Sequence, residues 1–285
     1  MPELPEVETV ARSVDQRVRG DRIVEVWFCS HPQSFKTPPA EQAKGLTGRV
    51  FLAVHRTGKH IICELGPALT VGKRAAARKG EAAQAQWIVH LGMTGRLLVT
   101  DADAPVTAHT HARLTLASGR ELRFVDPRRF GRLDFHDLQR HAGFASQGAE
   151  PLTIGKEEFA ALFRGRRLPI KAALLNQRLL TGVGNIYADE ALFRAGVRPR
   201  RMAGRLTREE LERLRVGLIE VLRHAIRLGG SSVSDYVDAN GDPGSFQVEH
   251  CVYRRTGLPC RRCGREIRRI VLAGRGTHYC PQCQH

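Results

Sequence analysis

Four cysteines near the C-terminus constrain the fold of this chain more than any other feature. Cys260 and Cys263 form one Cys-x2-Cys pair, and Cys280 and Cys283 form a second pair after a gap of sixteen residues. This is the spacing of a four-thiolate zinc site, in which four protein ligands leave no open coordination position. We therefore predict one structural Zn²⁺ per chain, held on a β-hairpin. A module of about forty residues is too small to fold on its apolar core alone, so the metal should stabilise it.

The other cysteines, and the arginines between the two cysteine pairs, say less about the structure and function of the chain. The chain has seven cysteines, an odd number that argues against a disulfide framework. Cys29, Cys63 and Cys251 stand in apolar surroundings, and we expect them to be buried thiols. A basic hairpin tip would grip phosphates or, in the alternative interpretation, form a solvated basic face. The arginines between the cysteine pairs are Arg261, Arg262, Arg265, Arg268, Arg269 and Arg275.

The first half of the chain is typical of a β-sandwich. A helix is expected over 6–19, where valines recur at helical spacing and Gly20 follows. Short strand-like runs separated by turn signals come next. Residues 71–86, rich in Ala, Gly, Lys and Arg, are expected to form a surface loop. The predicted strands are 22–29, 49–55, 60–65, 86–91, 96–100, 111–116, 120–125 and 132–135.

The pattern becomes helical after about residue 150. Helices are predicted over 157–164, 170–180 and 186–194, the last with Asn185 as its N-cap. Thr207 and Glu210 form a capping box before a longer amphipathic helix, which ends at Gly229-Gly230. The chain is thus predicted to be an α+β multidomain protein. The expected parts are a sandwich domain (1–138), a helical domain (151–228), a loop (229–245) and a zinc module (246–285).

The net charge of the chain limits the kinds of partner that it is expected to bind. Lys and Arg number 45 against 29 Asp and Glu, a formal net charge of +16 with a pI near 10.3. Such a chain favours a polyanion, above all nucleic acid, although a merely basic soluble protein has the same charge. No signal peptide or apolar span is apparent, so we expect no membrane association and a cytoplasmic location. No oligomerisation pattern is visible, and a monomer is expected.

The N-terminus reads Pro2-Glu3-Leu4-Pro5-Glu6-Val7-Glu8. If Met1 is trimmed, Pro2 becomes a free secondary amine, which attacks a carbonyl-like carbon and forms an iminium ion. That cation withdraws electrons from a sugar C1′, and Glu3 and Glu6 are placed in the sequence to move protons. The alternative is an ordinary helix start, where proline and acidic residues are also favoured.

Several further motifs resemble one family closely. The chain is similar to bacterial formamidopyrimidine-DNA glycosylase, a bifunctional repair enzyme for oxidised purines. The resemblance implies a β-sandwich, a helix–two-turn–helix domain and a zinc finger, with DNA in the cleft between the halves. It covers nearly the whole chain. Besides the N-terminal run and the terminal four-cysteine module, the matching motifs are Gly58-Lys59, His90-Leu91-Gly92-Met93-Thr94-Gly95, Asp126-Pro127-Arg128-Arg129-Phe130-Gly131 and Gly182-Val183-Gly184-Asn185-Ile186-Tyr187-Ala188.

The resemblance also implies residue roles at the reacting sugar and along the DNA backbone. Pro2 is expected to be the nucleophile, Glu3 the general acid/base, and Glu6 a supporting residue. Lys171 resembles a residue near the lesion. The expected phosphate contacts are Lys59, His90, Asn185 and Arg275.

Further roles concern the space that a flipped base leaves behind. Met93 is expected to fill that space, because an unbranched side chain slides easily between bases. Arg128 and Phe130 resemble the partners that face the orphaned cytosine and wedge the stack. The 229–245 loop matches the segment that closes over the flipped base. Taken without the resemblance, Met93 would be a core methionine and Phe130 a strand residue.

The expected reaction is excision of 8-oxoguanine opposite cytosine, or of formamidopyrimidines, followed by β,δ-elimination. The partner is double-stranded DNA that contains oxidised purines or abasic sites, within the nucleoid. An oxidised-pyrimidine glycosylase of the endonuclease VIII type and a non-catalytic zinc DNA-binding protein remain alternatives. The endonuclease VIII group usually has glycine where this chain has Leu4, and it uses a different wedge. Residues 72–86 resemble an insertion.

Overall fold

A computed structural model describes residues 1–30, 35–68, 82–233 and 236–285, which form two compact units. The sandwich unit comprises Met1–Pro2, Glu6–Ala145 and Ser231–Gly244. The helical unit comprises Glu3–Pro5, Ser146–Gly230 and Ser245–His285. Residues 71–81 of the predicted surface loop lie outside the described residues, and Ala85 and Gln86 belong to a strand instead.

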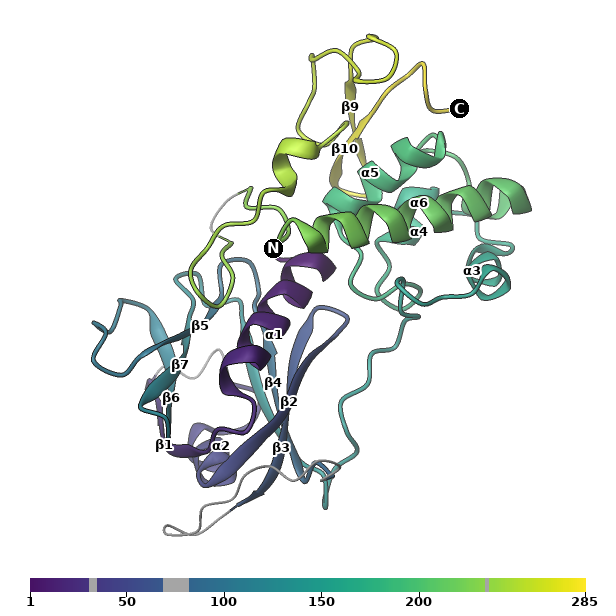
Figure 1. Ribbon diagram of the computed structural model, residues 1–285. Helices are drawn as coiled ribbons and strands as arrows, with labels where there is room; N and C mark the ends of the chain where they lie inside the picture. The colour runs from purple at the N-terminus through teal and green to yellow at the C-terminus, as the bar shows by residue number, and fades with distance from the viewer. Residues whose placement is uncertain (31–34, 69–81, 234–235) are drawn as a thin grey trace. The chain divides into compact units, whose positions relative to one another are not determined.

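Two four-stranded antiparallel sheets build the sandwich unit (Figure 1), which confirms the predicted β-sandwich. One sheet has the order β1-β6-β7-β5 and the other β2-β3-β4-β8. All eight predicted strands are present, with ends shifted by three residues or fewer. They are β1 (Ile23–Phe28), β2 (Arg49–Thr57), β3 (His60–Ala68), β4 (Ala85–His90), β5 (Arg96–Asp101), β6 (Thr110–Leu116), β7 (Arg120–Val125) and β8 (Arg132–Asp137).

Two helices accompany these sheets. Helix α1 (Leu4–Val18) begins two residues before the predicted start, because Pro5 is tolerated in a first helical turn, where its missing N–H is not needed. Helix α2 (Pro39–Leu46) has no counterpart in the sequence prediction. It is short, and its apolar residues are too few for a clear helical period. Only Gln42 and Leu46 of this helix are buried.

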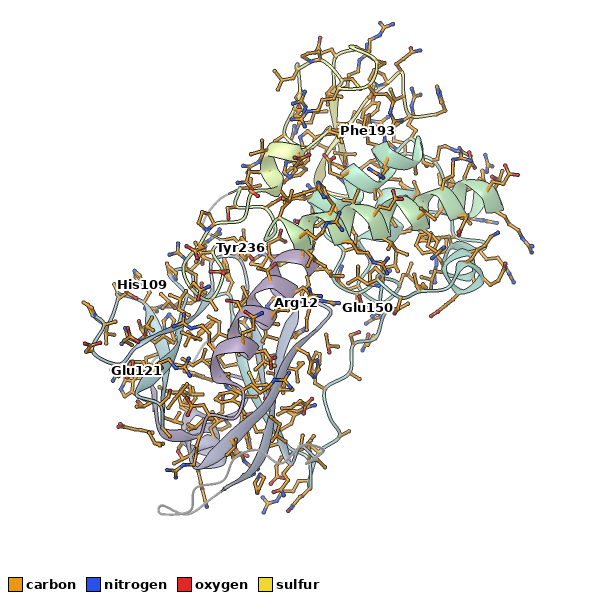
Figure 2. All side chains as sticks on the ribbon, viewed as in Figure 1. Arg12, His109, Glu121, Glu150, Phe193 and Tyr236 are labelled. Carbon is orange, nitrogen blue, oxygen red and sulfur yellow. The ribbon has the colours of Figure 1, made fainter. Side chains whose placement is uncertain are left out.

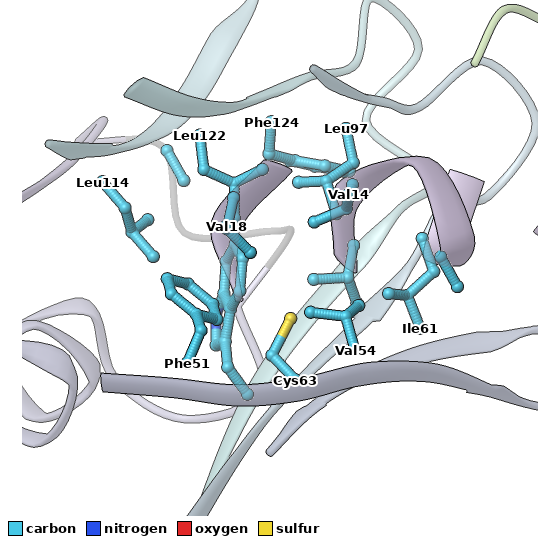
Figure 3. Packing of buried hydrophobic residues seen from close by; sticks show 14 of the residues in the cluster. Val14, Val18, Phe51, Val54, Ile61, Cys63, Leu97, Leu114, Leu122 and Phe124 are labelled. Carbon is cyan, nitrogen blue, oxygen red and sulfur yellow. The ribbon is translucent and has the colours of Figure 1, made fainter. Parts of the chain in front are cut away.

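The core of the sandwich unit lies between the sheets and α1. Val14 and Val18 of α1 are fully buried, as are Phe51 and Phe124, which come from opposite sheets. Figure 3 shows these side chains packed around Cys63. The helical spacing of the valines and the alternation along the strands thus converge on one apolar cluster, as the binary pattern predicts.

Helices dominate the other unit, and two sequence predictions fail there. Helix α4 ends at Leu174 rather than at 180, because the Asn176 side chain accepts a hydrogen bond from Arg178 N (3.0 Å) and closes a turn. Asn185 is the first residue of its helix, and Gly184 is the N-cap. The Thr207–Glu210 capping box is confirmed. The helices are α3 (Lys156–Phe163), α4 (Ile170–Leu174), α5 (Asn185–Ala195), α6 (Arg208–Arg227) and the short η2 (Ala203–Arg205) and η3 (Phe246–Glu249).

The C-terminal module is a hairpin of β9 (Arg268–Leu272) and β10 (Arg275–Tyr279). Ala273 and Gly274 form its turn, both with positive φ. The module packs on Phe193 of α5, which is labelled in Figure 2, through a small cluster with Val252 and Ile267. No helix in the described part of the chain is long and apolar enough to cross a membrane.

The cysteines outside the module differ in exposure. Cys63 is fully buried, as predicted. Cys29 and Cys251 are half-exposed, so the prediction that both are buried thiols was wrong. Both residues lie outside the strands, Cys29 directly after β1 and Cys251 in a loop, and each is only partly covered.

Candidate functional site

The Glu3 carboxylate lies at the N-terminus of α5 in the helical unit. It accepts hydrogen bonds from Ile186 N (3.2 Å) and Tyr187 N (3.4 Å) and is 5% exposed. A hydrogen bond from Leu4 N to Gly182 O (3.0 Å) holds the segment in place. The first backbone N–H groups of a helix have no internal partner and carry partial positive charge, so this is a favourable place for a carboxylate.

Gly184 makes the docking of Glu3 sterically feasible. A Cβ atom at this position would lie 2.1 Å from Glu3 Cδ, far inside van der Waals contact. The backbone here has φ −130°, which any residue adopts, so glycine is needed for space and not for conformation. The glycine of this motif therefore serves the carboxylate directly.

The start of β10, where Arg275 lies, is held from two sides. Asn185 donates from Nδ2 to Gly276 O (3.0 Å). Lys171 Nζ donates to the same carbonyl (3.0 Å) and to Thr277 Oγ1 (2.9 Å). Arg275 itself is exposed. Asn185 and Lys171, which are both expected to contact DNA, thus support the strand that carries Arg275.

Lys171 is only 1% exposed, and its ammonium group faces inward. Besides the two bonds to β10, Nζ forms an ion pair with Asp189 Oδ1 (2.7 Å). The ammonium group therefore makes two hydrogen bonds and one ion pair inside the unit. Burial lowers the pKa of Lys171, and the negative charge of Asp189 opposes that shift. Asp189 also accepts from the backbone N of His278 (2.9 Å), so the same carboxylate fixes β10 further along.

Met93, Arg128 and Phe130 lie on two neighbouring turns of the sandwich unit. Met93 is 42% exposed and Phe130 is 48% exposed. The Arg128 guanidinium carbon lies 5.0 Å from the centroid of the Phe130 ring, within cation–π range. The interpretations of Met93 as a core methionine and Phe130 as a buried strand residue do not fit this exposure.

Lys59 and His90 belong to the same unit. Lys59 follows Gly58, which has φ +61° in the turn between β2 and β3, and it is half-buried. His90 ends β4, and its Nδ1 accepts from Gly92 N (3.2 Å). Burial, with smaller effects from His60 and Lys59, lowers the pKa of His90 to about 4. His90 is therefore neutral at pH 7 and would offer a phosphate a hydrogen bond rather than a charge.

Glu6 fastens the 231–244 segment to α1. Its Oε1 accepts from Ser231 N (2.7 Å), and its backbone oxygen accepts from the hydroxyl of Tyr236 (3.3 Å). Figure 2 labels Tyr236 beside this helix. A backbone bond from Val99 N to Ala239 O (3.0 Å) anchors the segment further along.

Pro2 is buried and, with Met1 attached, its nitrogen is an acylated tertiary amide.

The four cysteines of the hairpin module converge on one point. Their sulfur atoms all lie within 4.8 Å of one another, with Cys260–Cys283 at 3.9 Å and Cys263–Cys280 at 3.5 Å. Sulfurs about 2.3 Å from a tetrahedral zinc ion are about 3.8 Å apart, so the geometry fits the metal. Backbone N–H groups of Arg262 and Cys283 point at the sulfurs of Cys260 and Cys280, respectively (both 3.4 Å), as they do around thiolates.

Three supporting residues were not predicted from the sequence. Asp189 lies in no motif, yet it contacts Lys171 and His278. Thr94 and Asp126 lie in the motifs of Met93 and Phe130, where Thr94 donates to Asp126 (2.6 Å) and Asp126 accepts from Gly131 N (2.7 Å). Only the tertiary contacts identify what each of them holds.

Comparisons with known proteins agree over the whole chain. Family models match the formamidopyrimidine-DNA glycosylase N-terminal domain at residues 1–133 and the corresponding H2TH domain at 148–237. A zinc finger found in FPG and IleRS matches at 257–285. A formamidopyrimidine-DNA glycosylase of Solibacter usitatus is 43% identical, with 100% of this chain and 99% of that protein covered.

Solved structures are also similar to the chain over its full length. A mutant FPG of Lactococcus lactis in complex with Fapy-dG-containing DNA has TM-score 0.85 at 34% identity and full coverage of both chains. MutM in complex with carbocyclic 8-oxo-G-containing DNA has TM-score 0.86, again at 34% identity and full coverage of both chains. Both of these similar structures contain bound DNA.

Proposed function

The chain belongs to the formamidopyrimidine-DNA glycosylase family, and we propose that it is a bifunctional glycosylase and abasic-site lyase for oxidised purines in double-stranded DNA. The proposed substrates are 8-oxoguanine opposite cytosine and formamidopyrimidines. One observation carries the proposal: Glu3, the residue that follows Pro2, is buried with its carboxylate held at the N-terminus of α5. A carboxylate held beside an N-terminal proline is the pair of groups that this chemistry needs.

The reaction begins after Met1 is removed. The lone pair of Pro2 N attacks C1′ of the damaged nucleotide, and the glycosidic bond breaks with its electrons going to the base, which takes up a proton. The sugar ring opens as the C1′–O4′ bond breaks, O4′ receives a proton from Glu3, and a C1′–N iminium forms. The iminium acidifies the C2′ hydrogens, so the 3′ phosphate leaves by β-elimination. The 5′ phosphate then leaves by δ-elimination, and a one-nucleotide gap with phosphate ends remains.

Each unit contributes its own set of DNA contacts in this proposal. In the sandwich unit, Lys59 and His90 bind phosphates, and the two turns with Met93, Arg128 and Phe130 fill the space left by the flipped base. In the helical unit, Asn185 and Arg275 bind phosphates, and Lys171 holds the strand from which Arg275 projects. Flipping a base costs a few kcal/mol, which the inserted side chains and phosphate contacts must offset.

The direct test is borohydride trapping. Protein without Met1 is mixed with a duplex that contains 8-oxoguanine opposite cytosine, and sodium borohydride reduces any iminium to a stable amine. We expect a covalent protein–DNA adduct whose DNA-linked residue is Pro2, identified by mass spectrometry, together with strand cleavage. Absence of an adduct from the Met1-free protein contradicts the lyase mechanism.

The same assay separates the alternatives. Faster cleavage at thymine glycol than at 8-oxoguanine would indicate an oxidised-pyrimidine glycosylase. Tight binding to the lesion duplex with no cleavage and no adduct would indicate a non-catalytic zinc DNA-binding protein. A protein that cleaves while Met1 is still attached would exclude Pro2 as the nucleophile.

Substituting Gly184 tests the docking of Glu3. Gly184→Ala is expected to lower excision roughly 100-fold, because the new Cβ overlaps the Glu3 carboxyl group and displaces it by about an ångström. The matched control is Gly155→Ala. Gly155 is also a helix N-cap, and a Cβ there meets nothing within 4 Å. Equal activity of both variants would show that the position of Glu3 is irrelevant to the reaction.

We further propose one Zn²⁺ per chain, bound by the four cysteines as a structural ion. We propose a monomer that acts on nucleoid DNA in the cytoplasm. The domain limits 1–138, 151–228, 229–245 and 246–285 likewise stay proposals.

A further inference from the structure

Asp126 is a fully buried carboxylate at the end of β7, between the two exposed turns of the sandwich unit. Its Oδ1 accepts a hydrogen bond from Thr94 Oγ1 (2.6 Å), in the turn that carries Met93. Its Oδ2 accepts from Gly131 N (2.7 Å), next to Phe130. Each oxygen of one side chain thus binds a different turn.

Two further hydrogen bonds support this arrangement. Thr94 Oγ1 accepts from Arg128 N (3.3 Å), so this hydroxyl contacts both Asp126 and the second turn. The backbone oxygen of Asp126 accepts from His111 Nε2 (2.9 Å). A carbonyl only accepts, so Nε2 carries the proton, and His111, 3% exposed, supports Asp126 from the core.

The two turns also touch directly, without room for adjustment. A Cβ at Gly92 would lie 2.5 Å from Gly131 N and 2.5 Å from the carbonyl carbon of Phe130. A Cβ at Gly131 would lie 2.4 Å from the ring of Phe124 in the core. The glycines therefore permit close backbone contact, and a shift of one turn moves the other.

We propose that Asp126 is a positioning residue that locks the turns of Met93, Arg128 and Phe130 into one rigid probe of the duplex. This rests on the proposed function, because it assumes that these side chains enter the DNA. Two independent flexible turns would lose conformational freedom on insertion, and a pre-formed pair avoids most of that loss. A buried carboxylate with two donors fixes both turns more strongly than neutral hydrogen bonds would.

Thr94 offers the cleanest pair of variants. Thr94→Val keeps the shape but removes the hydroxyl that donates to Asp126 and accepts from Arg128 N. Thr94→Ser keeps the hydroxyl and should restore both bonds. Asp126→Asn keeps one acceptor oxygen but places an amide NH2 where the second donor must be bound. If Asp126→Asn fails to fold, the two Thr94 variants still decide the question.

Each variant is measured in three assays. The first is excision of 8-oxoguanine opposite cytosine in a duplex, and the second is the ratio of excision opposite cytosine to excision opposite adenine. The third is cleavage at an abasic site in single-stranded DNA. Single-stranded DNA has no orphaned base and no stack to wedge open. For Thr94→Val and Asp126→Asn we expect duplex excision to fall roughly 10- to 100-fold and the base ratio to approach one. Single-strand cleavage should be unchanged, and Thr94→Ser should behave as the unaltered protein.

Two results would overturn the inference. One is duplex excision by Thr94→Val and Asp126→Asn at the unaltered rate. The other is an equal loss on duplex and single-stranded substrates, because a general loss of fold affects both. An unaltered protein without activity on either substrate contradicts the proposed function instead. In that case, the affinity of each variant is measured for a duplex with an abasic analogue opposite cytosine and for one with the analogue opposite adenine. If both affinities and their ratio equal those of the unaltered protein, the positioning role is overturned.

Discussion

Replacing Glu3 with glutamine is expected to lower excision of 8-oxoguanine by roughly 10²- to 10⁴-fold, the usual contribution of a general acid/base. Glutamine has the same shape but delivers no proton to the leaving sugar oxygen. Affinity for a duplex with an abasic analogue should survive, because the phosphate contacts remain. Single-turnover excision and equilibrium binding measure the two effects separately.

A second role of Glu3 must be distinguished from catalysis. Its carboxylate accepts from Ile186 N and Tyr187 N, so it also caps α5. The glutamine oxygen of Glu3→Gln still accepts one of these bonds, and a lost cap costs about 1 kcal/mol in stability. A loss of excision far larger than the loss of thermal stability therefore assigns the effect to proton transfer.

Glu8→Gln is the matched control for Glu3→Gln. It also replaces one carboxylate by an amide. Glu8 lies in α1 and forms ion pairs with Arg12 (2.6 Å) and Arg56 (2.9 Å). Excision by Glu8→Gln should equal that of the unaltered protein. Unchanged excision by Glu3→Gln would remove Glu3 from the mechanism.

Removal of the metal is expected to unfold the C-terminal module. Binding of structural zinc supplies on the order of 10–16 kcal/mol in zinc-finger peptides, and the module has only a few buried apolar residues of its own. A strong chelator or Cys260→Ser should expose the hairpin to proteases and displace Arg275, with a loss of duplex affinity. The helical signal of α5 and α6 should remain, because α6 closes its own capping box and packs on α5.

The control for Cys260→Ser is Cys251→Ser, which replaces a half-exposed cysteine outside the four-sulfur cluster. We expect one zinc ion per chain by atomic absorption in this control and in the unaltered protein. A Cys260→Ser variant with full zinc content and a protease-resistant hairpin would contradict a four-thiolate site.

Local patterns predicted most elements of the fold. The valines of α1, the alternation along the eight strands and the capping box of α6 each act within a few residues, so the sequence displays them. Helix α2 was missed because eight residues with two buried side chains give no period. The predicted extension of α4 to 180 failed because leucines at helical spacing continue past a turn that the Asn176 side chain closes.

For the candidate site too, local patterns predicted some features and long-range contacts set the others. Residue spacing and functional groups were enough to predict the four-cysteine cluster, which the structure confirms, and to propose Pro2 and Glu3 as the reacting pair. The folded chain was needed to show that Gly184 leaves room for Glu3, that Lys171 contacts Asp189 and β10, and that Asp126 hydrogen-bonds to two turns. These are contacts between residues far apart in the chain, and their strength depends on burial and distance, which no local pattern encodes.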